Sequence, residues 1–307
     1  IQLNQREIKL ELVKNQIGFL TNGIQTVQLE RPAKLNDGIE SLSMEEATYY
    51  ANFFDEKRNH LKLKKFVPAS GAASRMFKFL SEFLQDYKLG EESINAYINR
   101  KKAKNLSLFL IGLDKFPFYK EVIKQLKNQY PDFDNWGYDS KHYAFIKTLL
   151  SKNEFDFANK PKGVLPFHKY SSHVATPIEE HLNEAVAYAS SNQKAHLHFT
   201  VSEEHQSDFE KIVEKVKAKI ETASETEIYV YYSYQDKSTD SIALDFDNNF
   251  FREDNESLVF RPGGHGALIQ NLNSLDADVI FIKNIDNVIQ NHIEEISLYK
   301  KALAGIL

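Results

Sequence analysis

The sequence of 307 residues contains no cysteine. This absence excludes disulfide bridges, thiolate nucleophiles and cysteine-ligated zinc, and it suits a reducing compartment. Long apolar runs are also missing: the stretch at 279–282 is far shorter than the roughly 20 apolar residues that cross a bilayer. The first twenty residues interleave Gln, Glu and Lys with apolar residues, unlike a signal peptide. We therefore expect a soluble, cytoplasmic protein with no membrane partner.

An excess of charge of one sign is lacking as well. Lys and Arg number 38 against 43 Asp and Glu, and the formal net charge is −5. Without a basic field to attract a phosphate backbone, we expect no nucleic-acid partner. The chain also contains no H-E-x-x-H and no G-x-S-x-G motif, so zinc-protease and α/β-hydrolase functions are set aside.

The hydrophobic content of 42% is enough to bury a large core. Residues 1–60 predict an N-terminal flank of two amphipathic helices, the second capped by Ser43. Residues 61–307 predict one α/β domain that opens with a strand at 61–67 and carries an all-helical insertion at about 77–155.

After the insertion, helical and strand patterns alternate. Helices are expected at 179–190 and 203–223, and strands at 195–201, 227–234 and 278–283. This alternation predicts an α/β fold of Rossmann-like type, with a mostly parallel sheet flanked by helices.

Other features concern the hairpin and the ends of the chain. Residues 241–260 predict a hairpin around an Asp-Asn-Asn turn.

Because the chain starts at Ile1 without Met and stops soon after the motif at 281–287, we expect the C-terminal part of the domain to be absent.

The segment 68–76 is the first candidate site. Its small residues let a backbone approach a ligand closely, and the helix after it presents free N–H groups and a positive dipole end, which suits a triphosphate. Arg75, expected one turn into that helix, has a guanidinium that can hold phosphate oxygens. A tight strand-to-helix turn is an equally good reading of this loop alone. The nucleotide-binding candidates in the loop are Ala69, Ser70, Gly71 and Ala72.

Two further candidates are single charged residues. Lys162, fixed between Pro161 and Gly163, can point at phosphate, although a plain surface lysine is the commoner reading. Asp286 follows an apolar strand, at the end where open α/β sheets bind ligands, and is a natural magnesium ligand. The structural alternative is that Asp286 or Asn287 caps the following helix.

Three other patterns carry weaker signals. The glycines around His265 allow backbone and imidazole to contact a base or a sugar, or they form a simple turn. Asp245 and Asp247 imitate the metal motif of glycosyltransferases but read better as a hairpin turn. His196 and His198 share a strand face without a third ligand, so a packed pair is expected.

Taken in order along the chain, these motifs resemble those of UDP-sugar pyrophosphorylases. Residues 67–76 look like the family's A-G-G-x-G-T-R-L or P-A-A-G-x-G-x-R-M loop, and Pro161-Lys162-Gly163 looks like its P-K. Gln235 follows a strand as the family's Gln does. Residues 262–266 are similar to P-x-G-H-G, and residues 281–287 to F-V-S-N-V-D-N. Over 66–77 and 260–288 the chain also resembles a bacterial group of pyrophosphorylase-like domains of unknown function.

The resemblance implies a nucleotidyltransferase with the GT-A type fold, which transfers a nucleoside monophosphate from a nucleoside triphosphate, expected to be UTP, to a sugar-1-phosphate and releases pyrophosphate. It implies Mg²⁺ as cofactor, with any second metal ligand beyond residue 307. The implied roles are catalysis for Arg75 and Lys162, metal binding for Asp286, nucleotide binding for Gln235 and Gly264, and sugar binding for His265, Gly266 and Asn287.

Two departures from the pattern keep other functions open. Ala73 replaces the usual second glycine of the loop, and the helical insertion separates Arg75 from Lys162. A non-catalytic nucleotide-sugar-binding protein is one alternative, and a GT-A glycosyltransferase is a second. The third is a helical interaction module, because about half of the chain reads as helical against a base rate near one-third. The oligomeric state is open.

Overall fold

The fold is α/β and is built on a central five-stranded sheet. The computed structural model describes residues 2–24, 26–288 and 291–307. Four strands of the sheet run parallel in the neighbour order β11, β3, β7, β8. Their bounds are Val279–Ile282, Leu63–Pro68, Lys194–Thr200 and Glu227–Ser233. The predicted α/β class is confirmed.

The sheet is mixed, where the sequence predicted a mostly parallel one. The short strand β6 (Ser190–Ser191) runs antiparallel to the start of β7. Between them Asn192 and Gln193 have positive φ angles of 50° and 58°. Positive φ at both central residues is the signature of a tight two-residue hairpin turn, and this turn reverses the chain.

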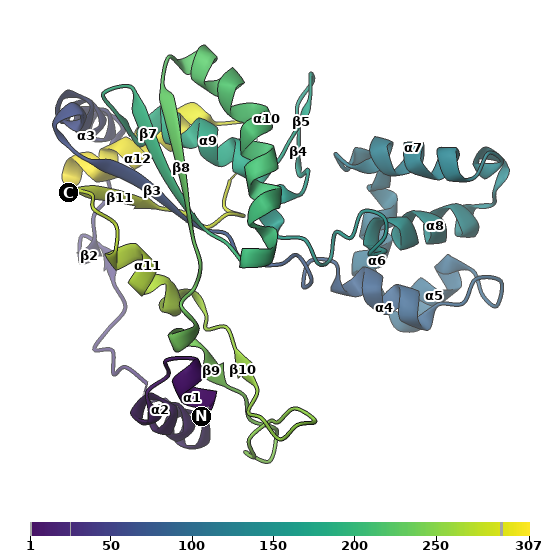
Figure 1. Ribbon diagram of the computed structural model, residues 1–307. Helices are drawn as coiled ribbons and strands as arrows, with labels where there is room; N and C mark the ends of the chain where they lie inside the picture. The colour runs from purple at the N-terminus through teal and green to yellow at the C-terminus, as the bar shows by residue number, and fades with distance from the viewer. Residues whose placement is uncertain (1, 25, 289–290) are drawn as a thin grey trace.

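Helices cover one face of the sheet (Figure 1). Ala195, Leu197 and Phe199 alternate along β7 and are buried beneath α9 (Pro177–Tyr188) and α10 (Gln206–Ser224). Alternation of buried residues along a strand is expected when one face of a sheet packs on a core. The helices and strands predicted for this region lie close to their expected positions.

Residues 78–150 form a helical lobe that Figure 1 shows to one side of the sheet. Its core is separate and rich in aromatic side chains; Phe83, for example, stacks on Tyr87 and meets Tyr97 edge-on. Its helices are α4 (Lys78–Asp86), α5 (Ile94–Lys101), α6 (Lys104–Ile111), α7 (Tyr119–Gln129) and α8 (Tyr138–Leu150).

The first sixty residues pack against two different parts of the chain. Helix α2 packs on the β9–β10 hairpin through Val13 and Ile242, whereas α3 packs along α12 through Ala47, Ala51 and Ala302. The bounds are α1 (Gln2–Gln5), α2 (Leu10–Asn22), α3 (Met44–Lys57), β9 (Ser241–Ile242), β10 (Phe260–Arg261) and α12 (Ile293–Ile306).

The predicted cap at Ser43 is confirmed. Its hydroxyl accepts a hydrogen bond from the backbone of Glu46, and the Glu46 carboxylate accepts one from the backbone of Ser43. Such a reciprocal box satisfies two backbone donors at the start of α3.

The remaining elements are short. They are β1 (Lys34–Leu35), β2 (Gly38–Ile39), β4 (His168–Lys169), β5 (Val174–Ala175) and α11 (Ile269–Asn273). Single turns of 3₁₀ helix lie at Arg58–His60, Leu113–Lys115, Phe133–Asn135, Lys162–Val164, Glu203–His205, Lys237–Thr239 and His265–Leu268. Among the described residues, no helix has the length and apolar character needed to span a membrane.

Candidate functional site

The carboxyl ends of the parallel strands meet at one edge of the sheet and bring two predicted motifs together. After β3, the N–H of Ala69 donates to Thr200 O of β7 (2.9 Å). After β11, the N–H of Ile285 donates to Pro68 O of β3 (3.1 Å). The loop that carries Gly71 and the segment that carries Asp286 therefore start from neighbouring strand ends, where α/β folds bind ligands.

Lys162 joins these two segments although the helical lobe separates it from Gly71 in sequence. Its backbone N–H donates to Gly71 O at 3.2 Å, and its ammonium contacts Asp286 Oδ2 at 2.6 Å. Pro161 forms an antiparallel bridge with Ala72. The chain thus leaves the sheet at the loop, completes the lobe, and returns to the same loop.

The ion pair between Lys162 and Asp286 affects the protonation of the carboxylate. The hydrogen bond from Lys162 holds the pKa of Asp286 below its ordinary value of 3.8, against a partial burial that raises it. A smaller electrostatic contribution from His265 lowers the pKa of Asp286 further. Asp286 is therefore ionised at neutral pH.

Asp286 is the residue at this edge that could contribute a carboxylate ligand to a metal ion. The side chain of Asp286 is 42% exposed. Magnesium is commonly bound through one or two carboxylates, with substrate phosphates and water completing its shell. Within the described residues, no group of three or more His, Asp or Glu side chains could hold a metal alone.

The phosphate-loop candidates divide into exposed and buried residues. Ser70, Gly71 and Ala72 are exposed at the sheet edge. Ala69 is 1% exposed and its N–H is already bonded to β7. It therefore anchors the start of the loop to the sheet.

Arg75 lies in a turn before α4, and not one turn into a helix as expected. The backbone of Ala73 is tied to Lys160 O (3.0 Å), and the N–H groups of Met76 and Phe77 both donate to Ala73 O. This extra turn delays the helix until Lys78. Arg75 is exposed and makes no hydrogen bond or ion pair with any residue that the structure describes.

Gln235 and the glycine-rich segment 262–266 are also brought together, because they contact each other directly. With its amide oriented to satisfy both groups, Gln235 accepts from Gly263 N (2.7 Å) and donates to Gly263 O (3.1 Å). A Cβ on Gly263 would lie only 3.0 Å from Thr239 O, so a side chain at this position would force its neighbours to shift. Gln235 thus holds the turn, while Gly264, His265 and Gly266 stay exposed beside it.

The helix-capping alternative for Asp286 and Asn287 is wrong. Both are exposed residues of a loop, in which Asn287 N donates to Asn284 O (3.0 Å). The next helix, α12, starts only at Ile293.

Two other expectations are confirmed. The carboxylate of Asp245 accepts from the backbone of Asp247 (2.9 Å) and Asn249 (2.8 Å), as a hairpin turn requires. His198 contacts Ser233 Oγ at 2.7 Å and stacks on Phe66.

His196 lies on the same strand face and stacks on Tyr229. Both histidines therefore pack against aromatic side chains, and within the described residues they belong to no group of three or more side chains that could hold a metal ion.

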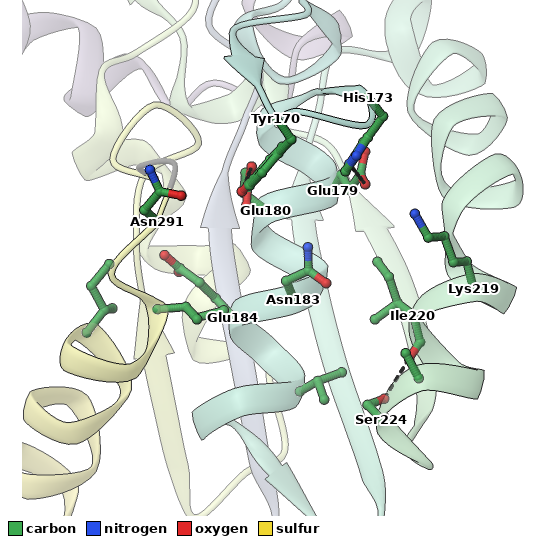
Figure 2. A pocket seen from close by; sticks show the side chains of 14 residues that line it. Tyr170, His173, Glu179, Glu180, Asn183, Glu184, Lys219, Ile220, Ser224 and Asn291 are labelled. Atoms are coloured by element: carbon green, nitrogen blue, oxygen red, sulfur yellow. Dashed lines mark hydrogen bonds and ion pairs between the residues drawn. The ribbon is translucent and has the colours of Figure 1, made fainter.

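A cavity of about 520 Å³ between α9, α10 and the start of α12 was not foreseen (Figure 2). Glu179 and Glu180 line it at 9% and 5% exposure; His173 contacts Glu179 (3.0 Å), and Tyr170 donates to Glu180 (2.7 Å). Burial raises the pKa of Glu180 above its ordinary 4.5. In sequence both acids look like ordinary first-turn residues of a helix.

Comparison with known proteins identifies the family. A family model described as a domain of unknown function, DUF4301, matches residues 1–307, so the chain belongs to this family. This agrees with the expected resemblance to a group of domains of unknown function. Searches of curated proteins and of solved structures found no match.

Proposed function

We propose that this protein is a magnesium-dependent nucleotidyltransferase of the UDP-sugar pyrophosphorylase type, with a GT-A type fold. The observation that supports it best is the position of Lys162, which contacts Gly71 through its backbone and Asp286 through its ammonium. Three motifs that resemble those of pyrophosphorylases, and that lie far apart in sequence, thus form one site at the carboxyl edge of the sheet.

In the proposed reaction, an oxygen of a sugar-1-phosphate attacks the α-phosphorus of a nucleoside triphosphate, for which we propose UTP. The new P–O bond forms as the bond to the bridging oxygen breaks, and pyrophosphate leaves in line. Phosphoryl-type transfers depend on positioning and charge neutralisation more than on a base. The exposed Gly71 loop holds the triphosphate, and Lys162 and Arg75 stabilise the charge that develops on it.

Asp286 would hold the metal ion, which supplies charge neutralisation and orientation of the phosphates when bound. The ammonium of Lys162 already lies on this carboxylate, so it is within reach of phosphates bound there. His265, Gly264 and Gly266 are exposed on the neighbouring turn and are assigned to the nucleoside and sugar, with Asn287 beside Asp286.

The direct test is pyrophosphate release from a panel of nucleoside triphosphates and sugar-1-phosphates with Mg²⁺. Release with UTP and one sugar phosphate supports the proposal and identifies the acceptor. Thermal stabilisation by UTP without release would instead support the nucleotide-sugar-binding alternative. The absence of both signals would contradict both functions.

Substitutions test the assigned roles. We expect Lys162→Ala and Asp286→Ala each to reduce pyrophosphate release by at least ~100-fold, a loss typical of removing a group that stabilises charge in the transition state. Lys101→Ala and Asp86→Ala are the matched controls, because these residues form an ion pair of similar exposure at 2.7 Å in the helical lobe. Full activity of either site variant would show that the roles are assigned wrongly.

The glycosyltransferase alternative is the weaker candidate. Its only motif contained Asp245, whose carboxylate is bonded to two backbone N–H groups within its own hairpin.

A further inference from the structure

A row of polar side chains lies within the apolar core beneath the sheet. His181, Glu184 and Tyr188 follow one another on a single face of α9 and are 0%, 4% and 0% exposed. Residues three and four apart share a helix face, so these side chains form a continuous ridge. We call this set the α9 ridge.

Glu184 connects the two strands that carry the halves of the candidate site. Its Oε2 accepts from Lys65 Nζ (2.8 Å) and from the Tyr188 hydroxyl (2.8 Å), and its Oε1 accepts from Lys283 Nζ (2.5 Å). Lys65 belongs to β3, which leads into the Gly71 loop, and Lys283 follows β11 directly. In Figure 2 the Glu184 side chain points toward the loop that precedes α12.

His181 holds the same segment one turn earlier on α9. Its carbonyl accepts from Lys65 Nζ (3.1 Å), and its ring Nε2 contacts Ile285 O (3.3 Å). A carbonyl only accepts, so this ring nitrogen carries the proton. Ile285 is adjacent to Asp286, and its own N–H is bonded to Pro68 O. The segment 283–286 is therefore held at both of its ends.

Stability alone is a weak reason for such a buried network. Removing charges from water costs free energy that their mutual attraction often fails to recover, and apolar residues of similar volume serve as well or better. Lys65 illustrates the cost, because burial lowers its pKa to about 7. What the network adds is a fixed geometry between β3, β11 and α9.

We propose that Lys283 and the α9 ridge are a positioning device, which fixes the segment 283–286 so that Asp286 faces Lys162 and could hold the metal ion of the proposed function. The effect on turnover rests on the proposed function, whereas the effect on the segment itself does not. Neither Lys283 nor Glu184 touches the substrate in this role; both act through Asp286.

The variant Lys283→Met separates the segment from the ridge while Glu184 keeps its pair with Lys65. Lys283→Arg preserves the charge and is the conservative rescue. Lys62→Met is the matched control, because Lys62 pairs with Asp276 (2.9 Å) just before the amino ends of the same two strands, β3 and β11.

The first measurement is amide hydrogen exchange, which needs no ligand. We expect the amides of Lys283 and Ile285, both bonded to β3 carbonyls, to exchange at least tenfold faster in Lys283→Met. We expect Lys283→Arg and Lys62→Met to keep the wild-type exchange rates. Unchanged exchange in Lys283→Met would overturn the inference, whatever the activity.

The second measurement is the Mg²⁺ dependence of pyrophosphate release. We expect Lys283→Met to raise the Mg²⁺ concentration for half-maximal rate at least tenfold while the KM for UTP changes less than twofold. A change in exchange without a change in Mg²⁺ dependence would contradict the link to Asp286. If the wild-type protein releases no pyrophosphate, the proposed function fails, and exchange alone decides whether the device exists.

Discussion

At the scale of single residues, the candidate site depends on a close backbone approach at Gly163. This glycine is buried next to Lys162, and a Cβ placed on it would lie 2.9 Å from Phe209 Cζ and 3.1 Å from two side-chain atoms of Ile285. Ile285 in turn adjoins Asp286. The missing side chain therefore lets the lysine turn sit directly against the segment that carries the acid.

We expect Gly163→Ala to destabilise the protein by about 1–3 kcal/mol, the usual cost of overpacking a filled core. Gly264→Ala is the control, because a Cβ there would meet nothing within 4 Å and its φ of −71° suits any residue. Urea unfolding at neutral pH compares the two. Equal stability of the two variants would mean that the turn has room to move away from Ile285.

At the scale of elements, α9 is both a packing helix and a carrier of buried polar groups. Thr176 caps it, Pro177 opens it, and Ile178 and Leu182 pack under the sheet. Burial, with smaller contributions from Lys65 and Lys283, holds the pKa of His181 well below its ordinary 6.5. The histidine is therefore neutral in the folded protein.

This depressed pKa predicts the sign of one pH effect. The unfolded chain binds a proton at His181 below about pH 6.5 and the folded chain does not, so stability falls as pH decreases through this range. A single proton contributes a slope of up to about 1.4 kcal/mol per pH unit. We expect His181→Gln to remove that part of the slope in urea unfolding between pH 7.5 and 5.5. An unchanged slope would mean that other groups account for the acid sensitivity.

At the scale of the whole molecule, α3 and α12, which lie far apart in sequence, pack against each other beside the sheet (Figure 1). They approach each other closely at Gly305, where a Cβ would lie only 2.0 Å from the backbone oxygen of Tyr50. Ala302 and Ala51 are buried in the same contact. Small residues let the two helices pack at short range.

We expect Gly305→Ala to lower the free energy of unfolding by at least about 1–3 kcal/mol, because the helices must separate to admit the methyl group. Gly18→Ala in α2 is the matched control: its Cβ would meet nothing within 4 Å, so alanine should stabilise that helix by about 0.5–1 kcal/mol. Thermal unfolding distinguishes the two. Changes in Tm of opposite sign for the two variants support close helix packing at Gly305. An unchanged Tm of Gly305→Ala contradicts it.

Features that depend on neighbouring residues were predictable from the sequence. The capping box at Ser43, the hairpin turn at Asp245 and the strand that ends before Asp286 follow from interactions within a few residues, and the structure contains all three. The motif order also indicated that the Gly71 loop, Lys162 and Asp286 belong to one site. That grouping relied on resemblance, because no local rule joins residues on either side of a helical lobe.

What the tertiary structure alone decided are contacts between residues distant in sequence. It placed Arg75 in a turn before α4, because Ala73 is tied to a carbonyl across the lobe, and it paired Gln235 with the glycine turn. It also paired Glu184, which looks like an ordinary acid of a helical pattern, with one lysine in β3 and one directly after β11. Periodicity specifies which face of a helix is buried, but the charges that meet there depend on how the strands are ordered in space.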